Sequence, residues 1–146
     1  MNEHERGFLT FLAEPTRQRM QALLELGDKR RRDVRALLHH AVRFDSRLSQ
    51  HLTGGDAFAG PVEALLRKAG ATSECYVLAA NTQLDGRVMR LREALDAIIG
   101  GGDGAFVSCI PGRLAFYEYA GTKSSYILNI RPSVRNALAS RQSVSD

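Results

Sequence analysis

Four consecutive cations, Lys29 to Arg32, follow Asp28, where the sequence predicts that a helix begins. The N-terminus of a helix carries roughly +0.5 of an elementary charge, so each cation there loses about 0.3–1 kcal/mol of favourable dipole energy. A run of this kind needs either solvent to screen it or an anion to compensate it. The chemistry that these residues could perform is therefore anion binding.

The charged run continues as a stripe along the predicted helix. On a helical wheel the outward face carries cations at a spacing of i, i+3, i+7 and i+11, which are Arg32, Arg35, His39 and Arg43. Arg30 and Arg31 lie nearer the apolar edge, where their stems can pack while their heads reach solvent. The stripe suits a nucleic-acid phosphate backbone, with little base readout because no aromatic or amide side chain joins it. A solvated helix face explains the same pattern and is favoured.

A second group of chemically useful residues lies in the segment 108–113 and on the strand after it. Cys109 offers a thiol, Arg113 a cation that could activate it, and Glu118 a carboxylate. These three residues are candidates for an enzyme pocket. The plainer interpretation, which we favour, is that Cys109 is an inert thiol of an apolar strand.

The strand predicted over residues 113–119 alternates between two faces. One face carries Leu114, Phe116 and Glu118, and the other carries Arg113, Tyr117 and Tyr119. Tyrosine and arginine are enriched at protein interfaces. The second face is therefore either an exposed surface for self-association or a sheet face that the chain's own helices cover.

The glycine-rich segment 100–104 does not predict a nucleotide site. Its glycines follow a predicted helix and precede a strand, whereas a phosphate loop follows a strand and precedes a helix. Metal binding is not indicated either, since the adjacent His39 and His40 point about 100° apart on a helix. No Cys-x-x-Cys or His-Glu-x-x-His spacing occurs in the sequence. We expect neither a metal nor a cofactor.

Helices are predicted to position these residues in the first half of the chain. They run from Pro15 to Gly27, from Asp28 through Val42, from Asp45 or Ser46 to Gly54, and from Pro61 to Gly70. The second of them has the best-defined apolar stripe, which consists of Val34, Leu37, Leu38, Ala41 and Val42.

Strands dominate the second half. The sequence predicts a strand over residues 75–80, a turn at Asp85-Gly86, and a helix whose apolar face extends from Leu91 to Ile99. Three strands follow at residues 105–110, 113–119 and 125–130, the first two joined by a type II turn over residues 110–113. This β-α-β-β-β order after a helical segment predicts an α+β fold with a mainly antiparallel sheet.

Two short segments resemble the first helix and the recognition helix of small winged-helix bacterial repressors. They are Leu12 to Leu24, which includes Glu14-Pro15-Thr16-Arg17, and Leu48-Ser49-Gln50-His51-Leu52. The resemblance covers under a third of the chain, and Gly54-Gly55 stands where that family continues into a fourth helix and a wing. It implies a DNA-binding helix at residues 48–52.

The length of 146 residues fits one domain, which we divide into a helical subdomain (8–53), an α+β subdomain (60–131) and a polar tail (132–146). An apolar fraction of 44% and a charged fraction of 25% are ordinary for a soluble globular protein. No apolar run approaches 18 residues and no signal-peptide core follows the polar N-terminus, so we expect a cytoplasmic protein that does not contact a membrane. Its two cysteines are expected to be reduced and buried.

The excess of basic residues lies in the N-terminal part of the chain. Residues 14–47 hold nine Lys/Arg against five Asp/Glu, whereas residues 56–146 hold ten against nine.

Because nothing in the sequence assembles a catalytic triad or a cofactor fingerprint, the first functional hypothesis is a non-catalytic binding or assembly module that self-associates. Nucleic-acid binding through the stripe is the alternative, and an enzyme with the Cys109, Arg113 and Glu118 pocket is the third. The sequence identifies no small-molecule ligand.

Overall fold

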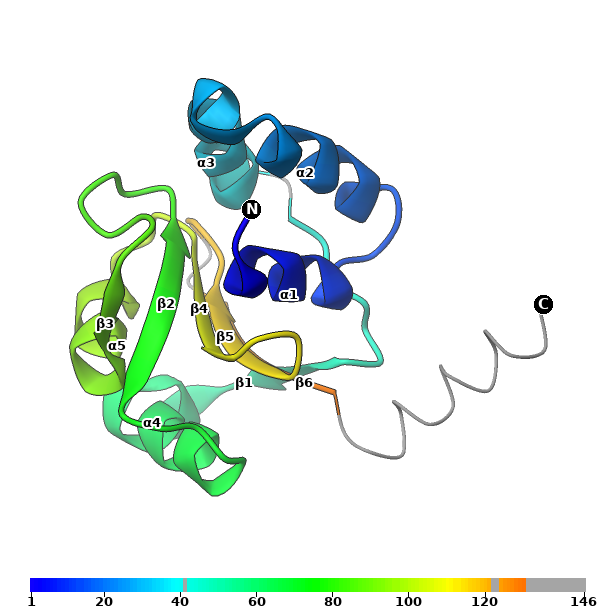
Figure 1. The fold of residues 1–146 in the computed structure, drawn as a ribbon. Helices are drawn as coiled ribbons and strands as arrows, with labels where there is room; N and C mark the ends of the chain where they lie inside the picture. The colour runs from blue at the N-terminus through cyan, green and yellow to red at the C-terminus, as the bar shows by residue number, and fades with distance from the viewer. Residues whose placement is uncertain (41, 122–123, 131–146) are drawn as a thin grey trace, which may run out of the picture.

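Helices form the N-terminal part of the chain in the computed structural model, which describes residues 1–40, 42–121 and 124–130 (Figure 1). They are α1 (Glu3–Phe11), α2 (Thr16–Glu25), the 3-10 turn η1 (Gly27–Arg30) and α3 (Arg31–His40). Each α-helix buries one apolar side, as a period of 3.6 residues requires. No helix in these described ranges has the length and apolar composition needed to cross a membrane.

A six-stranded antiparallel sheet forms the middle of the molecule, with its strands in the order β1-β6-β5-β4-β2-β3. The strands are β1 (Ser49–Leu52), β2 (Glu74–Ala79), β3 (Val88–Arg90), β4 (Ala105–Ile110), β5 (Leu114–Glu118) and β6 (Ser125–Asn129). The 3-10 turn η2 (Gly54–Ala57) and α4 (Ala59–Lys68) connect β1 to β2. A further helix, α5 (Leu91–Ile98), connects β3 to β4.

Helices cover both faces of the sheet, so the molecule has three layers (Figure 1). On one face, α1, α2 and α3 pack in a buried cluster that includes Phe8 and Tyr117. On the other face, α4 and α5 pack in a second cluster that includes Leu95 and Phe116. Successive residues of a strand point to opposite faces, which is why the neighbours Phe116 and Tyr117 belong to different clusters.

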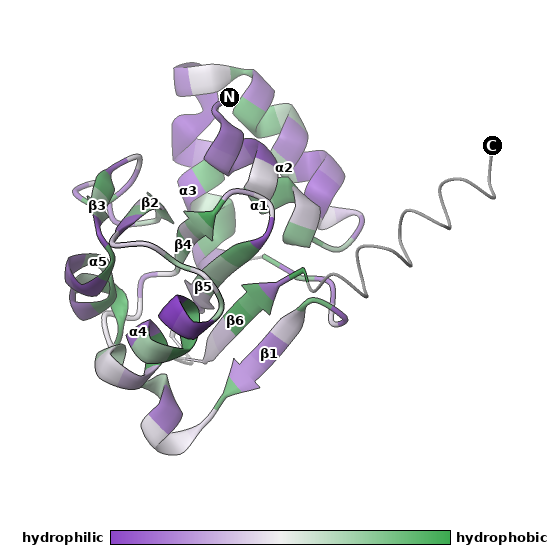
Figure 2. Cartoon of the chain, turned by 60° about the horizontal axis from the view of Figure 1, so that its bottom comes forward, coloured by the Kyte–Doolittle hydropathy of each residue, from purple (hydrophilic) through white to green (hydrophobic). Residues whose placement is uncertain are grey.

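Both edge strands of the sheet are short. β1 has four residues and β3 has three. β1 is mainly hydrophilic, whereas its neighbour β6 is mainly hydrophobic (Figure 2). Short, polar edge strands limit pairing with the sheet of another molecule.

The predicted α+β class is confirmed, since an antiparallel sheet follows a mostly helical N-terminal part. β4 spans the predicted residues, and β5 and β6 end within one residue of the predicted limits. The backbone N–H of Arg113 donates to the Ile110 carbonyl at 3.0 Å, and Gly112 has a φ of 70°, as a type II turn requires. A register shift between Ser108 and Ile110 makes this connection looser than a two-residue hairpin.

The helix predicted from Asp45 or Ser46 to Gly54 is wrong, because residues 49–52 form β1. β1 pairs with β6 so that His51 lies opposite Tyr126. The four-residue spacing of Leu48 and Leu52 fits one face of a helix, but an even spacing also fits one face of a strand. The resemblance to a recognition helix therefore does not hold for the structure of this segment.

The limits of the second predicted helix also differ from those of α3 in the structure. Asp28 lies in the 3-10 turn that precedes α3, so it does not cap the α-helix. α3 ends at His40, and the Arg43 carbonyl accepts a hydrogen bond from the Ala13 backbone N–H at 2.9 Å. Arg43 is therefore outside the helix. Ala41 of the predicted apolar stripe and the polar tail 132–146 lie outside the described residues.

Two elements were missed by the sequence analysis. α1 begins with a capping box, in which the Asn2 side chain accepts from the Glu5 N–H and the Glu5 side chain accepts from the Asn2 N–H. This Asn-x-x-Glu spacing is the signal that could have predicted α1. β3 is too short to show an alternating pattern of its own.

Candidate functional site

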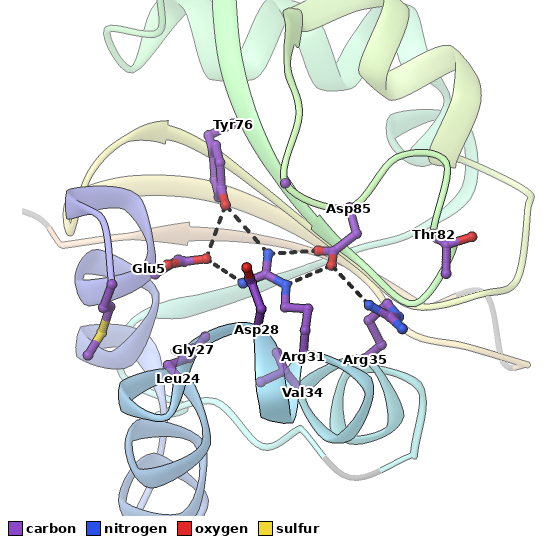
Figure 3. Close-up of a pocket in the computed structure, with 12 residues that line it drawn as sticks. Glu5, Leu24, Gly27, Asp28, Arg31, Val34, Arg35, Tyr76, Thr82 and Asp85 are labelled. Atoms are coloured by element: carbon purple, nitrogen blue, oxygen red, sulfur yellow. Dashed lines mark hydrogen bonds and ion pairs between the residues drawn. The ribbon is translucent and has the colours of Figure 1, made fainter.

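A polar cavity of about 430 Å³ lies between the helical layer and the loop that joins β2 to β3, residues 80–87 (Figure 3). We call it the interlayer cavity. Its lining comes from α1, α2, η1, α3, β2, the β2–β3 loop and Met1, which precedes α1. The polar residues among them are Glu5, Asp28, Arg31, Arg35, Tyr76, Thr82 and Asp85.

Arg31 occupies the middle of the interlayer cavity and bonds to opposite walls (Figure 3). Its Nε donates to Asp85 Oδ2 at 2.7 Å and its Nη2 to Asp85 Oδ1 at 3.0 Å, which is a bidentate pair. Its Nη1 donates to Glu5 Oε2, which also accepts from the Tyr76 hydroxyl at 3.1 Å. Arg31 thus ties α1 to the β2–β3 loop through two carboxylates.

Burial and ion pairing shift the pKa values of Arg31 and Glu5 in opposite directions. Desolvation alone would lower the pKa of Arg31, but hydrogen bonds to Asp85 and Glu5 outweigh it and raise the pKa above its ordinary value. Desolvation alone would raise the pKa of Glu5, but hydrogen bonds from Arg31 and the Asn2 N–H, with the charge of Arg31, hold it below its ordinary value. Arg31 and Glu5 are therefore both ionised at neutral pH.

The lowered pKa of Glu5 predicts a pH-dependent contribution to stability. The substitution Glu5→Gln keeps a side chain that fits the capping box but removes the charge. We expect it to lower the free energy of unfolding by about 1.5–3 kcal/mol at pH 7, the usual range for a hydrogen bond to a charged group.

The folded-state pKa of Glu5 lies below the ordinary value of 4.5 for this side chain, so the stabilisation is complete above that value and is lost as the pH falls through the folded pKa. Urea unfolding of the wild type and of Glu5→Gln, at pH 7 and at pH 3, measures the difference. It should be largest at pH 7 and shrink at pH 3. A difference that does not change with pH would contradict the ionised pairing of Glu5.

A second, more open cavity of about 540 Å³ lies between α3 and the first residues of the β2–β3 loop. We call it the basic groove. Its polar lining consists of Arg32, Arg35, His39, His40, Asn81, Thr82 and Asp103. Four of these side chains can carry a positive charge, whereas only Asp103 can carry a negative one. Arg35 and Thr82 line both the basic groove and the interlayer cavity.

The cationic side chains of the basic groove differ in whether they already pair with other residues of the chain. Arg32 is exposed, and no ion pair joins it to another residue in the described part of the chain. Arg35 Nη1 lies 3.8 Å from Asp85 Oδ2, at the long end of an ion pair. His39 Nδ1 lies 3.0 Å from the Asp103 carbonyl oxygen, so Nδ1 carries the donated proton and Nε2 is left for another partner.

The structure separates the cations of the charged run and of the predicted stripe. Arg32, Arg35 and His39 come together in the basic groove. Arg30 instead forms an exposed ion pair with Asp33 at 3.3 Å. Arg31 bonds inside the interlayer cavity and does not extend its head into solvent. Arg43 follows the end of α3 and is not part of the groove lining.

The face of β5 that was a candidate interface is covered by the chain's own helices. Tyr117 is completely buried in the cluster beneath α1, α2 and α3, and its hydroxyl donates to the Leu38 carbonyl oxygen. The partly buried Tyr119 ring contacts the rings of Tyr117 and Tyr126. Arg113 is exposed at the turn. Tyr117 therefore cannot contribute to an exposed interface.

The structure does not gather Cys109, Arg113 and Glu118 into one pocket. Cys109 and Cys75 are buried on the side of α4 and α5, where desolvation raises the pKa of each thiol to about 12. Glu118 lies at the far end of β5, and its carboxylate accepts hydrogen bonds from the Gly100 N–H at 3.0 and 3.2 Å. A thiol that stays protonated at neutral pH is a poor nucleophile. The third hypothesis therefore has no geometric support.

Sequence reasoning missed six residues that complete the two cavities: Glu5, Tyr76, Asn81, Thr82, Asp85 and Asp103. Glu5 and Asp85 are 26 and 54 residues away from Arg31 along the chain, so no local spacing connects them. The dipeptide Asp85-Gly86 predicted a turn, which exists, but a turn signal does not identify an ion-pair partner.

Within residues 1–40, 42–121 and 124–130, no group of three or more His, Cys, Asp or Glu side chains is placed to hold a metal ion. Comparison of this chain with known protein families, with curated proteins and with solved structures found no match. The geometry and charge of the two cavities are therefore the basis for a functional assignment.

Proposed function

We propose that this chain is a non-catalytic binding module whose basic groove holds a compact anion, such as a phosphate group. The observation that carries the proposal is the gathering of four cationic or protonatable side chains around one open cavity. They are Arg32, Arg35, His39 and His40, and Asp103 is the one carboxylate that joins them among the described residues of the groove lining. Like charges around a groove repel one another, and a bound anion replaces that repulsion with attraction.

The hydrogen-bond donors of the basic groove support an oxyanion as the ligand. The guanidinium groups of Arg32 and Arg35 offer planar forks that match phosphate oxygens in two-point contacts. The Asn81 amide and the Thr82 hydroxyl add neutral donors from the β2–β3 loop. A volume of about 540 Å³ is within the range of small-molecule sites.

A nucleic-acid backbone is the second candidate, and the distribution of charge favours it less. Arg30 is paired with Asp33, and Arg31 is paired with Asp85 and Glu5. Both arginines would have to break an ion pair to bind a phosphate. A nucleic acid would need cations spread along several phosphates, whereas Arg32, Arg35 and His39 converge on one groove. A steep loss of affinity for DNA or RNA with rising salt would favour this candidate.

Self-association of the chain stays a separate prediction. The strongest argument from the sequence for self-association was the strand face that carries Tyr117, and Tyr117 is buried. The short edge strands also offer little backbone for pairing with a second copy. The proposal of an anion-binding groove does not depend on oligomerisation.

Two matched arginine variants test the proposal. Arg32 and Arg30 are both exposed and are two residues apart, but Arg32 lines the groove and Arg30 does not. In isothermal titration calorimetry with pyrophosphate, Arg32→Ala should weaken binding by roughly 10- to 100-fold, the value of one or two charged hydrogen bonds. Arg30→Ala, which removes the same charge, should bind as the wild type does. Equal losses in both variants, or no pyrophosphate binding by the wild type, would overturn the proposal.

A further inference from the structure

We infer that the basic groove takes up one proton together with each anion that it binds, and that His39 is the side chain that accepts the proton. The inference rests on the proposed function and adds the regulation of the same site, because anion binding then depends on pH. Its starting point is that His39 lines the groove and donates from Nδ1 to the Asp103 carbonyl oxygen, at 3.0 Å. A carbonyl oxygen can only accept a hydrogen bond, so Nδ1 carries a proton in both charge states of the ring. The other nitrogen, Nε2, therefore decides how the ring meets an anion.

The Nε2 atom of His39 has opposite properties in the two charge states of the ring. In the neutral ring it is an acceptor, and its lone pair repels the oxygens of an oxyanion, which are acceptors too. In the protonated ring it is a charged donor, and charged donors form strong hydrogen bonds to oxyanions. An oxyanion can therefore bond to Nε2 only when a proton from the solvent buffer joins the ring.

Charged and protonatable groups reach His39 from α3 and from the loop that joins α5 to β4, residues 99–104. They are Arg32, Arg35 and His40 on α3 and Asp103 in the loop. The groove-lining residues of the β2–β3 loop that the structure describes, 80–82, are uncharged. Arg35 lies four residues before His39 on α3, where side chains are neighbours.

The charge around His39 changes when an anion enters the groove. In the empty groove the permanent charges of Arg32 and Arg35 exceed that of Asp103, so they oppose a further positive charge on His39. A bound dianion offsets the two arginines and attracts the protonated ring. The proton and the anion therefore favour each other's binding.

His39 is better placed than His40 to carry this proton. The bond from Nδ1 to the Asp103 carbonyl oxygen orients the His39 ring in both of its charge states. The His40 ring lies perpendicular to the His39 ring, with the ring centroids 4.3 Å apart. Two protonated rings at this distance repel each other, so we expect one proton for each anion.

Proton uptake gives anion binding a defined dependence on pH. Histidine is the side chain that ordinarily changes its charge between about pH 5 and 8. Sulfate stays a dianion throughout this range, unlike phosphate, so it reports only protons that the protein takes up. At the acidic end the His39 ring is already protonated and the sulfate affinity should not change with pH. At the basic end the affinity should fall by about tenfold per pH unit, the linkage expected for one proton.

Isothermal titration calorimetry of the full chain with sulfate at pH 7.5 counts the protons. Bis-Tris and Tris are cationic buffers that release a proton with different enthalpies, so the difference between the binding enthalpies in the two buffers gives the number taken up. The wild type should take up about one proton. His39→Gln, whose amide is a neutral donor, should take up none and bind sulfate roughly tenfold more weakly, as expected for the loss of one charged hydrogen bond. His51→Gln removes the same kind of side chain from β1, outside the groove, and should leave both values unchanged.

Long-range ¹H–¹⁵N correlation spectra of the histidine rings identify which residue accepts the proton. During the sulfate titration at pH 7.5, the Nε2 signal of His39 should move to the position of a protonated ring. The signals of His51 should stay where they are, because β1 does not line the groove.

The outcomes separate this inference from the proposed function. Sulfate binding without proton uptake, pyrophosphate binding without sulfate binding, or uptake that survives in His39→Gln would overturn the inference and leave the anion-binding groove in place. Protonation of His40 in place of His39 in the spectra would overturn the assignment of the proton. Absence of binding of both sulfate and pyrophosphate, at pH 6 and at pH 7.5, would overturn the proposed function, and this inference with it.

Discussion

Replacing Arg31 by methionine is expected to lower the free energy of unfolding by about 3 kcal/mol. Arg31 bonds to both Asp85 and Glu5, whose side chains are only 5% and 9% exposed. Methionine fills the space of the arginine stem but leaves these two carboxylates without their cation. The expected value is at the lower end for buried ion pairs because the Arg31 side chain keeps 20% exposure. Urea unfolding at neutral pH measures the loss.

The neighbouring Arg30 provides the control. Its ion pair with Asp33 is exposed, with side-chain exposures of 57% and 49%, and pairs of this kind contribute about 0–1 kcal/mol. Arg30→Met should therefore change the free energy of unfolding far less than Arg31→Met does. Equal effects would mean that Arg31 does not hold the helical layer against the β2–β3 loop.

Replacing Gly7 by alanine is expected to destabilise the protein, although alanine is the better helix former by about 1 kcal/mol. Gly7 lies within α1, against the turn between β4 and β5. A Cβ atom on Gly7 would lie 2.2 Å from the Gly112 nitrogen and 2.9 Å from the Pro111 carbonyl carbon. These are backbone atoms that cannot rotate away, so α1 must shift. Overpacking of this kind costs about 1–3 kcal/mol, occasionally more, and outweighs the helix propensity.

Gly60 is the matched control because it also lies in a helix, α4. A Cβ atom on Gly60 would meet only the end of the Arg92 side chain, at 3.8 Å. The following Pro61 disfavours the helical conformation for a residue with a Cβ atom, which offsets the higher helix propensity of alanine. Gly60→Ala should therefore shift the thermal unfolding midpoint far less than Gly7→Ala does. A rise in the midpoint for Gly7→Ala would contradict the close approach of α1 to the turn.

The second half of the fold was predictable because its signals are local. The strands at 105–110, 113–119 and 125–130 alternate or are uniformly apolar, and the turn before Arg113 has proline and glycine at the required positions. Residues 49–52 were not predictable in this way. Their strand forms by pairing with β6, more than 70 residues later, and the spacing of Leu48 and Leu52 fits both kinds of element.

The candidate site was predictable only for the residues that lie on one helix. Arg32, Arg35 and His39 share an outward face of α3 at helical spacing, and the structure places them in one groove. Arg31 belongs to the same charged run, but its pairing depends on Glu5 and Asp85, which the packing of three layers brings to it. Charge and spacing identify which cations share a face. They do not identify which of them the fold neutralises.

The anion-binding groove is tested most directly by two-dimensional ¹H–¹⁵N correlation spectra recorded during a titration with inorganic phosphate at constant ionic strength. The backbone amide signals of Arg32, His39, Asn81 and Thr82 should shift together and saturate at one affinity, because these residues line one groove. The signal of Arg30, which is exposed but outside the groove, should not follow them. Unsaturable shifts spread over all exposed cations, or no shifts in the groove, would contradict the assignment of this chain as an anion-binding module.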